Sequence, residues 1–334
     1  MISSLIRFII SICLIGLLAF VLRKDIPTIV ETVHTVDLSS LIIGLGFTLL
    51  GACVMGLRLS WVFKAQNITL SWVDGIKTTY IGLFFNNFLP TSVGGDIAKT
   101  YCIATRTKDA IGSISGVFMD RVFALFIFIL TPSITVVFLA DNIDPRVTQL
   151  VLMVLFGALV FLLLIFFPKI LKFLAFAKPA LKRVPGFDQV VQIYQNMHGM
   201  SRNLNMVSKI MGASFFGQML NFFSIYMLSI SIGAHINITY FFMAVPVIFL
   251  FSMLPSINGL GIREAGFVYF FSDSMGSGGA STLAILYLSY MIAASIIGGI
   301  VYATHKEYHF NANGLKAWMK TNSSKEQSSA RNLR

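Results

Sequence analysis

Six runs of about 20 apolar residues set the strongest limit on how this chain can fold, because a helix needs that length to cross a bilayer. The runs lie at residues 4–22, 38–63, 111–139, 150–167, 209–232 and 282–304. Apolar residues make up 56% of the 334 residues and charged residues 12%, against about 45–50% and about 25% in soluble domains. The sequence therefore predicts an all-α integral membrane protein. It excludes a soluble enzyme, a nucleic-acid-binding domain and a disordered chain.

Two further apolar segments, 78–98 and 241–272, contain residues that break helices. The first carries Asn86, Asn87, Pro90, Gly94, Gly95 and Asp96, and the second carries Pro246, Pro255, Asn258, Gly259, Gly261, Arg263 and Glu264. Proline and glycine interrupt helical hydrogen bonding, and the freed backbone groups persist at membrane depth only inside protein or beside a wet cavity. We expect both segments to be re-entrant hairpins that return to the side from which they entered.

The distribution of Lys and Arg predicts the orientation. With the N-terminus in the cytoplasm and both hairpins re-entrant, the inner segments hold 19 of the 25 Lys and Arg residues, and the outer loops hold three. Positive residues accumulate on the cytoplasmic side of membrane proteins. We therefore expect a multi-pass protein of the cytoplasmic (inner) membrane with both termini inside, a single membrane domain over 1–305, and a basic, disordered tail over 306–334.

The two broken segments share a motif. Leu-Pro-Thr-Ser-Val-Gly-Gly-Asp-Ile from Leu89 lies over Leu-Pro-Ser-Ile-Asn-Gly-Leu-Gly-Ile from Leu254, 165 residues later. Each half, about 1–145 and 146–305, contains two spans, a broken segment and a span, so the halves are expected to be inverted in the membrane. Inverted halves with Gly/Pro-interrupted segments at matching positions are typical of transporters. Chance similarity, or a repeat in a protein that transports nothing, remains the alternative.

Ionisable side chains inside these segments are candidate site residues, because each is costly at bilayer depth unless paired or hydrated. The cations Arg58, Lys99, Arg121 and Arg263 are candidates for binding a phosphate, and the carboxylates Asp96, Asp120 and Glu264 for holding those cations in place. Structural alternatives stay open: Arg58 could extend to the interface, and Asp120 and Arg121 could form salt bridges to other helices.

Polar and backbone-breaking residues complete the candidate site. Asn86, Asn87 and Asn258 would form hydrogen bonds with a head group, and the turns would be shaped by Pro90, Gly94, Gly95, Pro255, Gly259 and Gly261. Each Gly-rich turn allows a helix to begin there with free N–H groups. Asn86 and Asn87, and likewise Gln218 and Asn221, could equally form hydrogen bonds between helices.

These motifs resemble the lysylphosphatidylglycerol synthase transmembrane, or flippase-like, family. The resemblance rests on Asn87–Lys99, Leu254–Glu264, the Arg58-x-x-Trp61 pattern and Asp120-Arg121, and it covers roughly residues 5–305. Three positions depart from the family pattern: Thr91 and Asn258 stand where Gly is common, and Lys99 where Arg is frequent. Lysine keeps the charge but cannot form the two parallel hydrogen bonds of an arginine.

The resemblance implies movement of a lipid between leaflets. The large family members move aminoacylated phosphatidylglycerol and carry a separate synthase domain, whereas other stand-alone relatives are associated with polyprenyl-phosphate sugars. We expect a lipid flippase for a phosphate-headed lipid, without enzymatic activity, metal or cofactor. Expected partners are an anionic or polyprenyl-phosphate lipid and a glycosyltransferase or lipid-modifying enzyme, and no nucleic acid. The alternatives are a non-transporting subunit that presents lipid to a glycosyltransferase, and an integral-membrane transferase.

Overall fold

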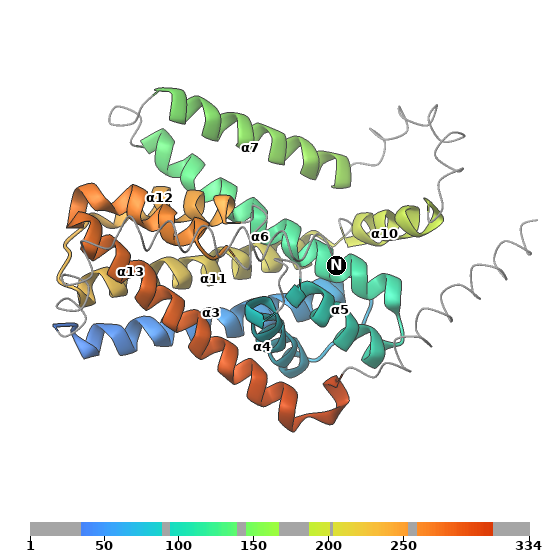
Figure 1. Ribbon diagram of the computed structural model, residues 1–334. Coiled ribbons are helices and arrows are strands. Elements are labelled where there is room, and N and C mark those ends of the chain that lie inside the picture. The colour runs from blue at the N-terminus through green and yellow to red at the C-terminus, as the bar shows by residue number, and fades with distance from the viewer. Residues whose placement is uncertain are drawn as a thin grey trace, which may run out of the picture.

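A computed structural model describes residues 35–88, 94–138, 145–166, 187–200, 203–252 and 259–309, and these residues form helices with no strand among them. The helices, shown in Figure 1, are α3 (Leu38–Ala65), α4 (Trp72–Phe88), α5 (Gly94–Thr107), α6 (Ala110–Phe138), α7 (Pro145–Phe166), α10 (Phe187–Met200), α11 (Leu204–Ser231), α12 (Ile238–Phe251), α13 (Ile262–Thr304) and the 3-10 helix η4 (Lys306–Tyr308).

Four of these helices are long and apolar enough to cross a membrane: α3, α6, α11 and α13. They confirm the helices expected at 38–63, 111–139, 209–232 and 282–304. The run at 150–167 falls in α7, whose described apolar part, Leu152–Phe161, is shorter than a span. The run at 4–22 lies outside the described residues.

Helices α3 and α11 pack side by side in opposite directions (Figure 1), and because they share the most extensive contact between described helices we call them the central pair. The N–H of Asp37, which caps the start of α3, donates to the carbonyl of Ser231 at the end of α11 over 2.8 Å. Near the middle, the hydroxyls of Thr48 and Ser224 lie 2.6 Å apart. Contacts between an early residue of one helix and a late residue of the other establish the antiparallel arrangement.

The two broken segments lie at opposite ends of this central pair. Ile103 of α5 packs against Phe63 near the end of α3, while Phe241 of α12 packs against Tyr226 near the end of α11. Because α3 and α11 are antiparallel, these two ends point away from each other, as Figure 1 shows. We call α4 with α5 the first hairpin, and α12 with the part of α13 before Gly276 the second hairpin.

A kink at Gly276 divides α13 into two functional parts. Its backbone angles, φ 72° and ψ 163°, belong to a region that only glycine adopts without strain. Ile262 to the kink completes the second hairpin, and the remainder to Thr304 is the apolar helix expected at 282–304. The sequence predicts that the second broken segment ends at residue 272 and that the next span begins at residue 282. The kink at Gly276 lies between these two positions.

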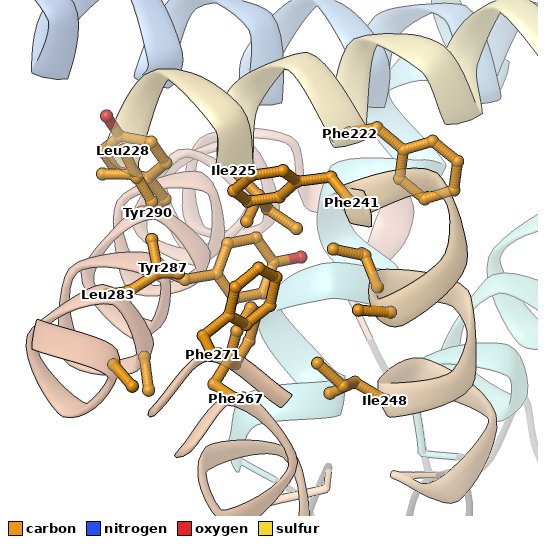
Figure 2. Packing of buried hydrophobic residues seen from close by; sticks show 14 residues of the cluster. Phe222, Ile225, Leu228, Phe241, Ile248, Phe267, Phe271, Leu283, Tyr287 and Tyr290 are labelled. Atoms are coloured by element: carbon orange, nitrogen blue, oxygen red, sulfur yellow. The ribbon is translucent and has the colours of Figure 1, made fainter. Parts of the chain in front are cut away.

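An aromatic cluster holds the second hairpin against α11. Figure 2 shows Phe222 of α11, Phe241 of α12, and Phe267, Phe271 and Tyr287 of α13 converging in one buried group. The ring centroids of Phe241 and Phe271 are 4.9 Å apart. Association of helices in lipid depends on such close packing, because the lipid tails are as apolar as the side chains. These aromatic residues therefore fix the hairpin in position.

The segment after α13 begins with ordered structure, which corrects the tail expected from residue 306. Tyr308 of η4 is 1% exposed and packs against Ile81 and Cys102 of the first hairpin. Its hydroxyl donates to Asp74 Oδ1 over 2.9 Å. Composition pointed to a polar tail, but one aromatic residue with a buried hydrogen-bond partner is enough to dock its first turn. Residues 310–334 lie outside the described residues.

Candidate functional site

The buried arginine of α3 is paired within the protein. Arg58, 4% exposed, donates from Nε and Nη2 to Asp120 Oδ1 of α6 over 2.8 and 2.7 Å. Its Nη1 lies 3.5 Å from the hydroxyl of Ser214 on α11. Breaking a buried pair of this kind leaves an uncompensated charge, which is strongly unfavourable. Arg58 thus connects α3 with α6 and α11. The alternative interpretation, in which Arg58 extends to the membrane interface, does not hold.

A second ion pair joins the first hairpin to α6. Arg121 Nε donates to Asp96 Oδ2 over 2.5 Å. The other carboxylate oxygen, Oδ1, is buried and has no hydrogen-bond partner among the described residues, while the Arg121 side chain is 37% exposed. Asp120 and Arg121 are neighbours in sequence but pair with different elements, because adjacent helical positions point about 100° apart.

Lys99 completes a cluster with an excess of positive charge. It lies on α5, three residues after Asp96, within electrostatic range of both Asp96 and Asp120, and it forms no ion pair with the described residues. The cluster contains the cations Arg58, Lys99 and Arg121 and the carboxylates Asp96 and Asp120, and we call it the charged cluster. Three cations against two carboxylates favour an anion at the exposed guanidinium.

The start of α5 is held tightly against α4. The N–H of Gly95 donates to the side-chain oxygen of Asn86 over 2.7 Å. A Cβ at Gly95 would lie 2.2 Å from the carbonyl oxygen of Gly82, so only glycine allows this approach. Gly94, also buried, begins the helix. Asn86 therefore has a structural partner, and its position fixes where the charged residues of α5 begin.

The charged residues of the second hairpin pair with each other. Arg263, 2% exposed, donates from Nη2 to Glu264 Oε1 over 2.6 Å, and Glu264 Oε2 accepts the N–H of Gly261 over 2.6 Å. The Gly259 carbonyl accepts the N–H of Arg263, and both glycines have positive φ angles. Here the charges close the turn that begins α13. Pro90, Pro255 and Asn258 lie outside the described residues.

A cavity of about 90 Å³ lies between the two halves, bounded by α3, α4, α11 and α13. Its polar lining consists of three amides, Asn86, Asn87 and Asn221, with Thr48 and Tyr287. Asn86 also holds Gly95 of the first hairpin. On the other side, Tyr287 carries the Arg263 guanidinium over its ring, 5.6 Å from the ring centroid. The lining of the cavity thus includes Asn86, which belongs to the first hairpin, and Tyr287, which contacts Arg263 of the second hairpin.

The sequence named some of these residues and missed others. Asn86 and Asn87 line the cavity, and the Nδ2 of Asn87 donates to the carbonyl of Met291 over 3.2 Å. Asn221, for which a hydrogen bond between helices was one alternative, forms such a bond with Tyr287 of α13, lines the cavity, and keeps an Oδ1 that is buried without a partner among the residues that the structure describes. Tyr287 and Met291 gave no sequence signal, because aromatic residues and methionine are ordinary in an apolar span.

The charged residues fall into two separate groups. The charged cluster lies by α5 and α6, and the Arg263–Glu264 pair lies at the start of α13; neither group lines the cavity directly. We expected all four cations to bind one phosphate, but Arg58 and Arg263 are buried in ion pairs. Lys99 and Arg121 therefore remain as the candidates for binding the phosphate. Among the arginines of the candidate site, only Arg121 has a partly exposed side chain.

Comparison with known proteins identifies the family. Residues 4–299 match the family described as the lysylphosphatidylglycerol synthase TM region. No curated protein matches the chain. The family match and the apolar helices make this a multi-pass helical membrane protein. Since the match covers nearly the whole chain, the protein belongs to the lysylphosphatidylglycerol synthase transmembrane-region family.

Proposed function

We propose that this protein moves a phosphate-headed lipid between the leaflets of the cytoplasmic membrane, without catalysing a reaction on it. The observation that carries the proposal is a cavity within the apolar bundle whose lining includes three amides, beside the first hairpin and the part of α13 after Gly276. Polar groups inside a membrane bundle mark substrate pathways. Family membership supports a role in lipid modification or transport.

The architecture that we propose is a pair of inverted halves with six spans and two re-entrant hairpins. Several observations support it. Helices α3 and α11 are both 28 residues long and antiparallel, and each is followed by a shorter helix, α4 or α12, that leads into a matching Leu-Pro motif. Gly51 and Gly217 occupy corresponding positions near the middle of these helices and meet there. A two-fold axis through this contact would exchange the halves.

The charged cluster is the proposed docking point for the phosphate. Arg121 uses Nε for Asp96, which leaves both terminal nitrogens of its fork for an incoming phosphate. Lys99, on the same helix as Asp96, compensates that carboxylate when the phosphate competes for Arg121. The head group then enters the cavity beside Asn86. The Arg58–Asp120 pair has a structural role, holding α6 against α3.

Alternating exposure follows from the two ends of the molecule. The first hairpin begins and ends at the end of the bundle where Lys and Arg are abundant, which we assign to the cytoplasm. The second hairpin lies at the other end. Small movements of one hairpin against the central pair would open the cavity to one face at a time, as in other transporters with inverted halves.

A leaflet-exchange assay tests this function. Purified protein is reconstituted in liposomes with fluorescent phosphatidylglycerol, lysyl-phosphatidylglycerol or a polyprenyl-phosphate sugar, and exchange is followed by quenching of the outer leaflet. We expect fast exchange of at least one lipid, lost in Arg121→Gln and retained in Lys209→Gln, a matched loss of charge at an exposed position of α11. Absence of exchange with folded protein contradicts the proposal and favours a subunit that presents lipid to a glycosyltransferase.

A further inference from the structure

The lining of the cavity distinguishes two kinds of lipid head group, those with neutral hydroxyls and those with an ammonium. Asparagine amides donate and accept, so they match hydroxyl groups, which also do both. From this lining we infer that the cavity binds a neutral, hydroxyl-bearing head group, glyceryl or glycosyl, and discriminates against an aminoacyl head group. The inference rests on the proposed function, because it assumes that the cavity receives a lipid head group.

An unpartnered acceptor points to a missing donor. Asn221 lines the cavity and forms a side-chain hydrogen bond with Tyr287, but its Oδ1 is buried and has no hydrogen-bond partner among the described residues. A buried acceptor without a partner is costly, so it marks a place where a ligand donor is bound favourably. Across the cavity, Asn86 and Asn87 of α4 complete a ring of amides drawn from both halves. A head group with several hydroxyls could contact more than one of these amides at once.

The cavity offers an ammonium group little compensation. No carboxylate is among the residues that line it in the described part of the chain. The other carboxylates of the site, Asp96 and Glu264, each pair with an arginine, and neither of them lines the cavity. An ammonium in a desolvated site requires such a partner.

The aromatic ring in the lining is already used. The Arg263 guanidinium lies over the Tyr287 ring, 5.6 Å from its centroid, so this face cannot also hold a ligand cation. Arg263 is 2% exposed and is paired with Glu264, so this buried ion pair has no negative charge left over for a ligand ammonium. Both features act against a lysyl head group and leave a neutral one unaffected.

Equilibrium binding, measured separately from lipid movement, tests this inference. The purified full-length protein in detergent is titrated with phosphatidylglycerol, a polyprenyl-phosphate glucose, lysyl-phosphatidylglycerol and phosphatidic acid. We expect at least one of the two hydroxylated lipids to bind about tenfold or more tightly than both lysyl-phosphatidylglycerol and phosphatidic acid. The two hydroxylated lipids distinguish a glyceryl from a glycosyl source.

Two variants of one residue test whether the cavity is responsible. Asn221→Asp introduces a carboxylate of the same shape, and we expect it to shift the preference toward lysyl-phosphatidylglycerol by about tenfold. Asn221→Leu removes the hydrogen bonds without adding charge, and we expect it to weaken only the hydroxylated lipid. Asn205→Asp, the same change at an exposed position of α11, serves as the matched control.

Several results would overturn the inference. These are equal or tighter binding of lysyl-phosphatidylglycerol by the unmodified protein, equal binding of phosphatidic acid, or the same shift in Asn221→Asp and Asn205→Asp. A protein that binds the hydroxylated lipid with the expected preference but does not move it between leaflets supports the inference and contradicts only the proposed function. The two failures are therefore distinguishable.

Discussion

The two hairpins use their charged residues in different ways. In the first hairpin, Asp96 pairs with Arg121 of a different helix, α6, and one of its oxygens has no partner. In the second hairpin, Arg263 and Glu264 are adjacent in sequence, and both are buried in a turn that they close themselves. The first arrangement connects two different helices, and the second stabilises one local turn.

This difference assigns the hairpins different roles. An ion pair with an exposed guanidinium can exchange its partner for an incoming anion at low cost. A fully buried pair loses much more when it is opened. We therefore expect changes in the second hairpin to affect folding and changes in the first to affect lipid handling.

Glu264→Ala should have the largest effect on stability. It leaves Arg263 buried without a counter-charge and removes the acceptor of the Gly261 N–H, which together should cost about 3–5 kcal/mol. Thermal unfolding in detergent measures the loss. Glu307→Ala, which removes an exposed carboxylate at 3.4 Å from Arg106, is the control and should cost less than about 1 kcal/mol. Equal losses would remove the distinction between a buried and an exposed pair.

Gly95→Ala should separate the two helices of the first hairpin. The added Cβ would lie 2.2 Å from the Gly82 carbonyl and 2.6 Å from the Asn86 side chain, so α5 must shift, at a cost of about 1–3 kcal/mol. Gly212→Ala, on α11 where nothing lies within 4 Å, should be neutral or stabilising. Denaturant unfolding of both variants checks the prediction. An unchanged free energy of unfolding in Gly95→Ala would show that α4 and α5 are not closely packed.

Tyr308→Phe should loosen the contact between η4 and the first hairpin. It removes hydrogen bonds to Asp74 and Arg106, at a cost of about 1 kcal/mol at neutral pH. Burial, followed by the hydrogen bond to Asp74, raises the pKa of Tyr308 above its ordinary value of 10.0. The stabilisation is therefore complete below pH 10 and is lost as the pH rises through the raised pKa.

Amide hydrogen exchange in η4 measures this contact. The difference in exchange rate between the unmodified protein and Tyr308→Phe should become smaller when the pH is raised above 10. Tyr269→Phe, at an exposed position of α13, is the matched control and should leave the exchange rates unchanged. A gap that widens with alkaline pH would contradict the raised pKa.

Asp96→Asn should have the smallest effect on stability, less than about 1 kcal/mol, because its partner Arg121 is partly exposed. Its effect on lipid exchange should nevertheless be large, since in the proposed mechanism this carboxylate positions Arg121 for the phosphate. Unfolding and leaflet exchange measured on the same preparation separate the two effects. A strongly destabilised Asp96→Asn with normal exchange in the folded fraction would reverse the roles of the hairpins.

The sequence predicted the helices better than their contacts. The runs at 38–63 and 209–232 correspond to α3 and α11 because a span requires about 20 apolar residues in succession, a local property. The two broken segments could also be located from a local property, because their proline and glycine residues interrupt an apolar run. The kink at Gly276 was not predicted, since one glycine among several carries no distinguishing signal. The ordered turn at Tyr308 was hidden by the polar composition around it.

The candidate site was predicted only as a set of residues. The cost of a charge at membrane depth identified Arg58, Asp96 and Asp120 as residues that need partners. Which residue pairs with which depends on helix packing, so the bond between Arg58 and Asp120, 62 positions apart, could not be derived from spacing. Asn221 was noticed as a polar residue in an apolar span, but its place in the cavity depends on how α11 faces α4.

In the arrangement that we propose, the two hairpins enter from opposite faces of the membrane, and the cavity lies beside the first hairpin and the part of α13 after Gly276. Single-cysteine labelling tests it directly, in a variant whose Cys13, Cys53 and Cys102 are replaced. Cysteines are introduced at two exposed loop positions, Thr69 before the first hairpin and His235 before the second, and a membrane-impermeant reagent is applied to each face of oriented vesicles. We expect Thr69→Cys to react only from the cytoplasmic face and His235→Cys only from the outer face. Reaction of both from the same face would contradict the inverted arrangement and the transport mechanism that depends on it.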